Sequence, residues 1–149
     1  MQIKNILLVE DNPKDAELTK IALDENNFAN QIDWVRDGVE ALEYLKAEGK
    51  FKNRKPVLPA VILLDLQMPR MDGIEFLTQI KNDAVLKTVP VVMLTSSRLE
   101  EDLVKSYSLG VNAYVVKPID LEDFINAIKQ LGIFWVIINE VPTKNLPNG

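Results

Sequence analysis

An apolar run bounded by two prolines lies near the middle of the chain. It extends from Pro59 to Pro69, includes β-branched residues and carries a single carboxylate, that of Asp65. A continuous apolar segment of this length is typical of a central parallel strand that is buried on both faces. Such a strand ends at Asp65, at the carboxyl edge of the sheet, where open α/β sheets bind their ligands. We therefore expect the other elements to be organised around this strand.

Strand-like and helix-like segments alternate along the chain. Four more strands are expected at 3–9, 31–36, 90–94 and 113–116. The segment after each strand has apolar residues at helical spacing. We expect the fourth helix to extend from Leu99 to Ser108, with Leu103 in the core and Gly110 as a left-handed C-cap. Asp120 is expected to cap the last helix. Five alternations predict an α/β fold with right-handed crossovers, a doubly wound five-stranded parallel sheet with helices on both faces.

Composition excludes several function classes. The 149 residues suffice for one domain with a substantial core. The chain has no cysteine and no histidine, which excludes disulfides, thiol chemistry, a Ser-His triad and a histidine metal site. A net charge of −5 argues against a nucleic-acid partner. No apolar run reaches the roughly 18 residues of a membrane span, and the N-terminal apolar patch is too short for a secretory signal. We expect a cytoplasmic protein.

Polar residues follow four of the expected strands at one edge of the sheet. They are Glu10 and Asp11 after the first strand, Asp65 after the central strand, Thr95 after the fourth and Lys117 after the fifth. Three carboxylates about 5 Å apart repel one another by about 3 kcal/mol per pair at an effective dielectric near 20. Such a cluster needs a cation, and hard oxygen ligands favour Mg²⁺ or Mn²⁺.

The same residues suggest phosphoryl chemistry. Asp65 can act as a nucleophile and form an aspartyl phosphate, while Lys117 and Thr95 hold the phosphoryl oxygens. Each residue also has an ordinary structural role. Glu10 and Asp11 would favour a helix N-terminus, Thr95 could be a turn residue, and Lys117 a solvated strand end. Convergence on one edge favours the chemical role, because the opposite strand ends carry no comparable groups.

Four motifs at these strand ends carry a family resemblance. They are Leu7-Leu8-Val9-Glu10-Asp11-Asn12, Leu63-Leu64-Asp65-Leu66-Gln67-Met68-Pro69-Arg70-Met71-Asp72-Gly73, Leu94-Thr95-Ser96 and Val116-Lys117-Pro118. In these motifs the chain resembles the receiver domain of two-component response regulators, from about Ile3 to Leu131. The resemblance implies a flavodoxin-like strand order of 2-1-3-4-5. It also implies that Asp65 accepts a phosphoryl group from a histidine of a partner sensor kinase.

The resemblance further assigns roles to individual residues. It implies that Asp11, Asp65 and the main-chain carbonyl of Gln67 ligate Mg²⁺, with Glu10 acting through water. Thr95 and Tyr114 would reorient on phosphorylation. The Lys117-Pro118 peptide bond would be cis, consistent with the preference of X-Pro bonds for such turns.

Two finer features suggest a subgroup. The long loop 49–59 and the pair Phe134-Trp135 resemble the stand-alone regulators of bacterial phytochrome-type histidine kinases. We expect a receiver domain at 1–131 and an extension at 132–149, in which 132–141 continues the last helix or forms an arm and 142–149 is a flexible tail. Because no DNA-binding domain follows the receiver, output should pass through a protein surface.

We also predict a homodimer. Its interface would use the face made by the fourth helix, the fifth strand and the last helix, together with Phe134 and Trp135. Apolar residues from Leu121 to Ile138 recur in steps of three and four, which predicts a projecting helix that needs a partner. The competing interpretation folds 133–141 back onto its own domain.

Three other functions are alternatives to a phosphorylation-dependent signalling switch. An aspartate-nucleophile phosphatase of the dehalogenase type would need a second acid two residues after Asp65, where the chain has Gln67. A flavodoxin-like nucleotide binder would hold phosphate after the first strand, where Glu10 and Asp11 would repel it. A P-loop enzyme is excluded because the chain has no Gly-x-x-x-x-Gly-Lys run. We therefore expect a signalling protein with slow self-dephosphorylation at most, and not an enzyme.

Overall fold

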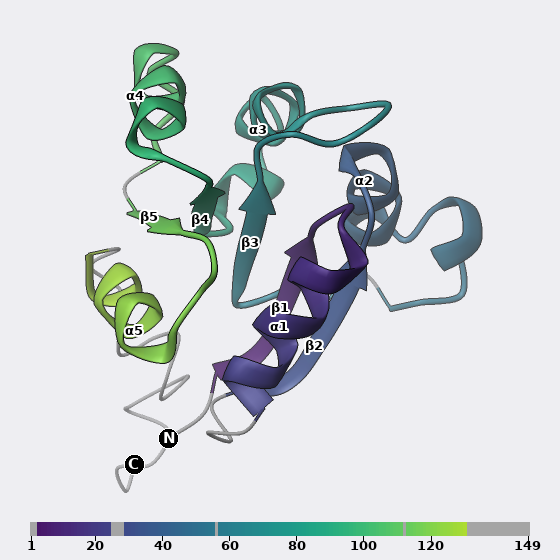
Figure 1. Cartoon of the computed structure of the whole chain (residues 1–149). Coiled ribbons are helices and arrows are strands. Elements are labelled where there is room, and N and C mark those ends of the chain that lie inside the picture. Colours follow the sequence, from purple (N-terminus) through teal and green to yellow (C-terminus); the bar gives the residue numbers. More distant parts are fainter. Residues whose placement is uncertain (1–2, 25–28, 56, 112, 131–149) are drawn as a thin grey trace, which may run out of the picture.

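Five parallel strands form one sheet in the computed structural model, which describes residues 3–24, 29–55, 57–111 and 113–130. The strands are β1 (Ile3–Val9), β2 (Ala29–Val35), β3 (Val61–Asp65), β4 (Val91–Thr95) and β5 (Ala113–Val116). Their order is β2-β1-β3-β4-β5, with β3 at the centre (Figure 1). The predicted fold class and strand order are confirmed.

Helices cover both faces of this sheet (Figure 1). They are α1 (Pro13–Asp24), α2 (Gly38–Lys46), α3 (Gly73–Lys81), α4 (Arg98–Ser106) and α5 (Leu121–Gln130), with 3-10 turns η1 (Gly49–Phe51) and η2 (Leu86–Thr88). One apolar cluster joins the sheet to α1 and α5, through residues such as Leu23 and Phe124. A second joins the opposite face to α2, α3 and α4, through residues such as Phe76 and Val104. The core therefore consists of two layers separated by the sheet.

Strand β3 has the burial that its apolar run predicts. All five of its residues are buried. Val61 and Leu63 pack into the α1/α5 cluster, whereas Ile62 and Leu64 pack into the other. Because alternate side chains fill opposite layers, the strand has no polar face, and its register is fixed on both sides by packing. Asp65 is thus held at the end of a strand that is buried along its whole length.

Side chains act as N-caps at the start of three helices. Asp37 accepts a hydrogen bond from the Glu40 N–H at the start of α2. Asp72 and Glu75 form a reciprocal capping box at the start of α3. Asp120 accepts from the Asp123 N–H at 2.9 Å, as expected for the cap of α5.

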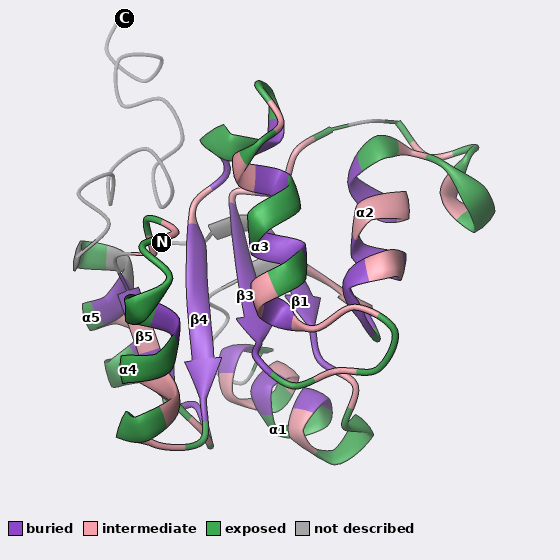
Figure 2. Ribbon diagram, turned by 90° about the horizontal axis from the view of Figure 1, so that it is seen from above, coloured by how far each residue is buried: buried purple, intermediate pink, exposed green. Residues whose placement is uncertain are grey.

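Helix α4 differs from the prediction in two respects. It ends at Ser106, and Ser108 takes the left-handed conformation with φ of 51°; Gly110, at φ 79°, also lies in this region, two residues further on. Leu103 is 48% exposed, so its expected core position is wrong. Val104 is the buried residue of α4, since it points to the sheet one position later. Figure 2 shows α4 exposed over most of its surface.

Several predictions concern residues that the structure does not describe. The extension 132–149, including Phe134 and Trp135, lies outside the described ranges. The loop 49–59 is described except for residue 56 and contains the short turn η1. Within the described ranges, no helix is long and apolar enough to span a membrane.

Candidate functional site

The register of the sheet brings the carboxyl ends of four strands to one edge. Val9 of β1 pairs with Leu64 of β3, and Asp65 pairs with Leu94 of β4. The backbone of Glu10, just after β1, is fixed on both sides. Its N–H donates to the carbonyl of Val35 at 3.0 Å, and its carbonyl accepts from the Trp34 indole N–H at 2.6 Å. The residues that follow β1 and β3 are thus set side by side by backbone pairing.

Three carboxylates gather at this edge. Glu10, Asp11 and Asp65 each offer an oxygen within 4.8 Å of the others. Glu10 and Asp65 are buried, whereas Asp11 is half-buried. All are oxygen donors, the ligand type preferred by Mg²⁺ and Mn²⁺, and their spacing allows one ion to contact all three.

Lys117 supplies the positive charge of the cluster. Its Nζ lies 3.2 Å from Glu10 Oε1, 3.2 Å from Asp65 Oδ1 and 3.1 Å from Asp15 Oδ2. Its side chain is only 16% exposed. The ammonium group has three N–H donors, and it has three carboxylates as partners. The predicted cis geometry of the Lys117-Pro118 bond is also confirmed.

The protonation behaviour of the cluster follows from burial and from these charges. Burial, followed by repulsion from Asp65, raises the pKa of Glu10 to about 7. Burial also raises the pKa of Asp65, although Lys117 opposes the shift. Burial alone would lower the pKa of Lys117, but the carboxylates around it outweigh burial and raise that pKa. Without a divalent cation, the cluster therefore holds its negative charge poorly, while Lys117 stays protonated.

A glycine allows α3 to begin against the backbone of Asp65. A Cβ on Gly73 would lie 2.5 Å from the Asp65 carbonyl oxygen, and the Gly73 N–H donates to the Leu66 carbonyl at 2.7 Å. The loop between them is also tied to α2, because Arg70 donates to both carboxylate oxygens of Asp37 at 2.7 and 3.1 Å. The loop that carries Gln67 is thus held at both ends.

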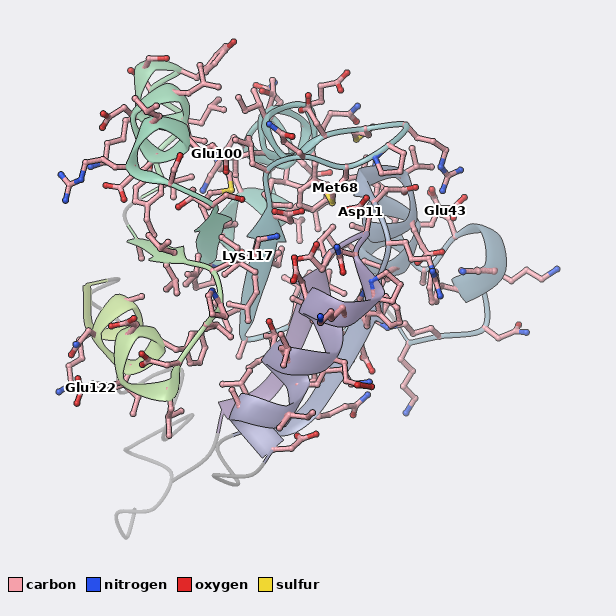
Figure 3. The ribbon with its side chains drawn as sticks, in the orientation of Figure 1. Asp11, Glu43, Met68, Glu100, Lys117 and Glu122 are labelled. Atoms are coloured by element: carbon pink, nitrogen blue, oxygen red, sulfur yellow. The ribbon has the colours of Figure 1, made fainter. Side chains whose placement is uncertain are left out.

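The charged residues line an open pocket of about 200 Å³. Its lining residues are Glu10, Asp11, Asn12, Asp15, Asp65, Gln67, Ser96, Glu100 and Lys117. Asp11, Lys117 and Glu100 reach this edge from the β1 loop, the end of β5 and the first turn of α4 (Figure 3). The sheet thus brings together Glu10, Asp11, Asp65 and Lys117, with Gln67 beside them.

Two predicted switch residues lie away from the pocket lining. Thr95 is completely buried at the end of β4, and its Oγ1 has no hydrogen-bond partner. Tyr114 is half-buried, and its hydroxyl donates weakly to the Val111 carbonyl at 3.4 Å. The Lys105 ammonium lies 5.2 Å from the centre of the Tyr114 ring. Neither hydroxyl contacts Asp65 directly in this structure.

The sequence reasoning missed two acidic residues of the pocket. Asp15 pairs with Lys117, and it lies three residues after Asn12, whose side chain accepts the Asp15 N–H at 3.1 Å at the start of α1. Glu100 accepts a hydrogen bond from the Ser96 N–H at 2.8 Å. It follows the N-cap Ser97 by three residues, which is the spacing of a capping box. Both signals were present in the sequence.

A family model and several relatives match the chain. The model described as the response regulator receiver domain matches residues 6–129. The solved structure of the bacteriophytochrome response regulator AtBRR is 52% identical over 93% of this chain and 99% of that chain, with a TM-score of 0.86.

Two curated relatives extend the comparison. The probable methanogenesis regulatory protein FilR2 of Methanothrix harundinacea is 41% identical over 92% of this chain and 86% of its own length. Response regulator Rcp1 of Synechocystis is 38% identical over 89% of both chains. Rcp1 also has a solved Mn²⁺-bound structure, which matches 93% of this chain and 96% of that chain with a TM-score of 0.69.

These matches favour one of the functions that the sequence suggests. They favour a phosphorylation-dependent signalling switch, and nothing in them favours a phosphatase of the dehalogenase type. The matched residues contain the whole sheet edge described above, from Glu10 to Lys117. The chain therefore belongs to the response regulator receiver domain family.

Proposed function

We propose that Asp65 is the phosphoryl acceptor of this switch and that a histidine of a sensor kinase is the donor. A carboxylate oxygen of Asp65 attacks the phosphorus, the P–N bond of the phosphohistidine breaks, and its electron pair returns to the imidazole nitrogen. The product is an acyl phosphate on Asp65. The observation that carries this proposal is the 3.2 Å contact between Lys117 Nζ and Asp65 Oδ1 at the floor of an open acidic pocket.

Each neighbour of Asp65 has a role in this transfer. Lys117 stays protonated, so it can hold a phosphoryl oxygen as a point charge. The buried hydroxyl of Thr95 has no partner, and it therefore has a hydrogen bond available for a new acceptor. The exposed mouth of the pocket admits the donor group, while the enclosed β3 fixes the nucleophile.

The acidic cluster fits a divalent cation. Glu10, Asp11 and Asp65, together with the main-chain carbonyl of Gln67, would hold Mg²⁺ or Mn²⁺. When bound, such an ion neutralises the carboxylates and the incoming phosphoryl charge. The Mn²⁺-bound structure of Rcp1 supports this assignment. The three carboxylates within 4.8 Å support it independently.

The proposed partner is a phytochrome-type histidine kinase in the cytoplasm. AtBRR supports it, since this relative is named as a bacteriophytochrome response regulator and its match covers 93% of this chain and 99% of that chain. The protein would act as a phosphoacceptor with slow self-dephosphorylation at most, and would not bind DNA directly.

We place the output surface on α4, β5 and α5. It carries large exposed apolar side chains, with Leu99 80%, Tyr107 53% and Val116 48% exposed. Reorientation of Thr95 and Tyr114 on phosphorylation would change this face. A homodimer would use it together with the extension 132–149 that follows the receiver domain, including Phe134 and Trp135. Sedimentation of the chain truncated after Leu131 tests the role of the extension in the dimer. If the truncated and intact proteins have the same oligomeric state, the extension has no such role.

Intact-mass spectrometry tests the acceptor role. The protein is incubated with Mg²⁺ and acetyl phosphate, in parallel with Asp65→Asn. We expect the wild-type chain to gain one phosphoryl group and the variant to gain none. A variant that still gains the group, or a folded wild-type chain that gains none, would contradict the proposal.

A further inference from the structure

A fifth carboxylate of the pocket that contains Asp65 comes from helix α4. Glu100 lies in the first turn of α4 (Figure 3). It lines the same pocket as Asp65 and Lys117. Its Oε1 accepts the Ser96 N–H at 2.8 Å, while its own N–H donates to the Ser97 hydroxyl at 3.3 Å. An ordinary capping box would return the carboxylate to the N–H of the N-cap, Ser97. Here the Glu100 carboxylate instead accepts the N–H of Ser96, the residue before the N-cap, at the wall of the pocket.

The Ser96 N–H is the group for which Glu100 competes. Ser96 follows Thr95 at the end of β4, and β4 pairs directly with β3 through Asp65 and Leu94. An oxygen anion already occupies this N–H in a pocket that Asp65 also lines. A phosphoryl group on Asp65 would bring about −1.5 to −2 charges and three acceptor oxygens into that pocket. One N–H offers one proton, so a phosphoryl oxygen and the Glu100 carboxylate cannot both take it well.

We propose that Glu100 is an internal competitor of the phosphoryl group. In the unphosphorylated protein its carboxylate accepts the Ser96 N–H, and its negative charge lies where the phosphodonor would enter the pocket. On phosphorylation it leaves that N–H to a phosphoryl oxygen. Because Glu100 belongs to α4, its release changes the first turn of the helix that forms the proposed output surface. Glu100 is therefore a positioning residue that slows phosphoryl uptake and links the site to α4. This inference rests on Asp65 being the phosphoryl acceptor.

Substitutions at two adjacent glutamates separate this role from a general charge effect. Glu100→Ala removes the competitor and its charge, whereas Glu100→Gln keeps an oxygen acceptor for the helix cap. Glu101→Gln is the matched control, since Glu101 carries the same charge one residue later and pairs with Lys105 at 2.7 Å outside the pocket. Phosphoprotein formed from acetyl phosphate and Mg²⁺ is followed by intact mass, with helix content checked by circular dichroism.

We expect Glu100→Ala to take up the phosphoryl group about two- to fivefold faster than wild type, the effect of removing one partly exposed charge and its hydrogen bond. Glu100→Gln should be intermediate, and Glu101→Gln should match wild type. If folded Glu100→Ala and Glu100→Gln are no faster than Glu101→Gln, the inference is wrong. If the wild-type chain itself takes up no phosphoryl group, the acceptor role of Asp65 fails instead.

The amide resonance of Ser96 provides a readout that a capping role alone would not produce. Before phosphorylation, the ¹H–¹⁵N signal of Ser96 should differ between wild type and Glu100→Ala, because only the wild type has the carboxylate partner. After phosphorylation the two signals should converge, since a phosphoryl oxygen becomes the partner in both. Signals that remain as far apart as before would overturn the inference.

Discussion

Replacing Asp11 by asparagine should stabilise the metal-free protein. The oxygens of the acidic cluster lie within 4.8 Å of one another, and at this distance two unit charges repel by about 3.5 kcal/mol at an effective dielectric near 20 and by about 0.9 kcal/mol in bulk water. Asp11 is half-buried, and no ion pair among the described residues includes it. Lys117 compensates Glu10 and Asp65 but not Asp11. We therefore expect Asp11→Asn to raise the free energy of unfolding by about 1–2 kcal/mol.

A divalent cation should remove this advantage. Binding to the native state stabilises it by RT ln(1 + [L]/Kd), which is about 1.4 kcal/mol when Mg²⁺ is present at ten times its Kd. The wild type should gain this amount. Asp11→Asn has lost a charged ligand and should gain much less at the same concentration. The difference in stability between the two proteins should therefore shrink or reverse as Mg²⁺ is added.

Thermal unfolding followed by circular dichroism, in EDTA and across a Mg²⁺ titration, measures both effects. In EDTA, Tm of Asp11→Asn should exceed that of the wild type by about 3 to 6 °C. Glu48→Gln removes the same charge at an exposed position and should change neither value. If Asp11→Asn is no more stable than the wild type in EDTA, or gains as much from Mg²⁺, the account of the cluster as a repulsive cation site is wrong.

Three further substitutions test the groups around the site by chemical denaturation. Thr95→Val should raise the free energy of unfolding by about 1 kcal/mol, because it removes a buried hydroxyl that has no partner; a loss of stability would mean that the hydroxyl is satisfied. Gly73→Ala should lower it by about 3 kcal/mol, because the new Cβ would meet the Asp65 carbonyl oxygen at 2.5 Å; an unchanged value would show that the loop adapts freely. Arg70→Ala should lower the free energy of unfolding at pH 7. Burial alone would raise the pKa of Asp37, but Arg70 and the helix N–H groups outweigh burial and hold that pKa below its usual value. The contribution of the pair is therefore fully present above the unfolded-state pKa of about 4, and it is lost as the pH falls through the lower folded-state pKa; a difference between the two proteins that does not diminish as the pH falls would contradict the ion pair.

The sequence predicts the structure well where a single factor, such as burial or a local hydrogen bond, determines the position of a residue. The apolar run up to Asp65 has no polar face, so a strand buried on both sides was the economical solution, and the structure has it. Parallel pairing then places every strand end at one edge, which made Glu10, Asp65 and Lys117 predictable as neighbours. Asp120 was recognisable as a cap because its role is local.

The prediction was less successful where the outcome depends on packing or on side-chain reach. Leu103 and Val104 are adjacent apolar residues of α4, and only the docking angle of the helix decides which one faces the sheet. Ser108, rather than Gly110, begins the left-handed turn after α4, although a glycine has less strain there. The contacts of Lys117 with Asp15 and of Ser96 with Glu100 depend on side-chain positions in three dimensions. Periodicity does not contain that information.

Locating the phosphoryl group on the chain tests the central claim most directly. Borohydride reduces an acyl phosphate of aspartate to homoserine, and tandem mass spectrometry of the digested protein then identifies the modified position. The account predicts homoserine at Asp65 after incubation with Mg²⁺ and acetyl phosphate, and at no other residue. Homoserine at Asp11 or another carboxylate, with Asp65 unmodified, would contradict it.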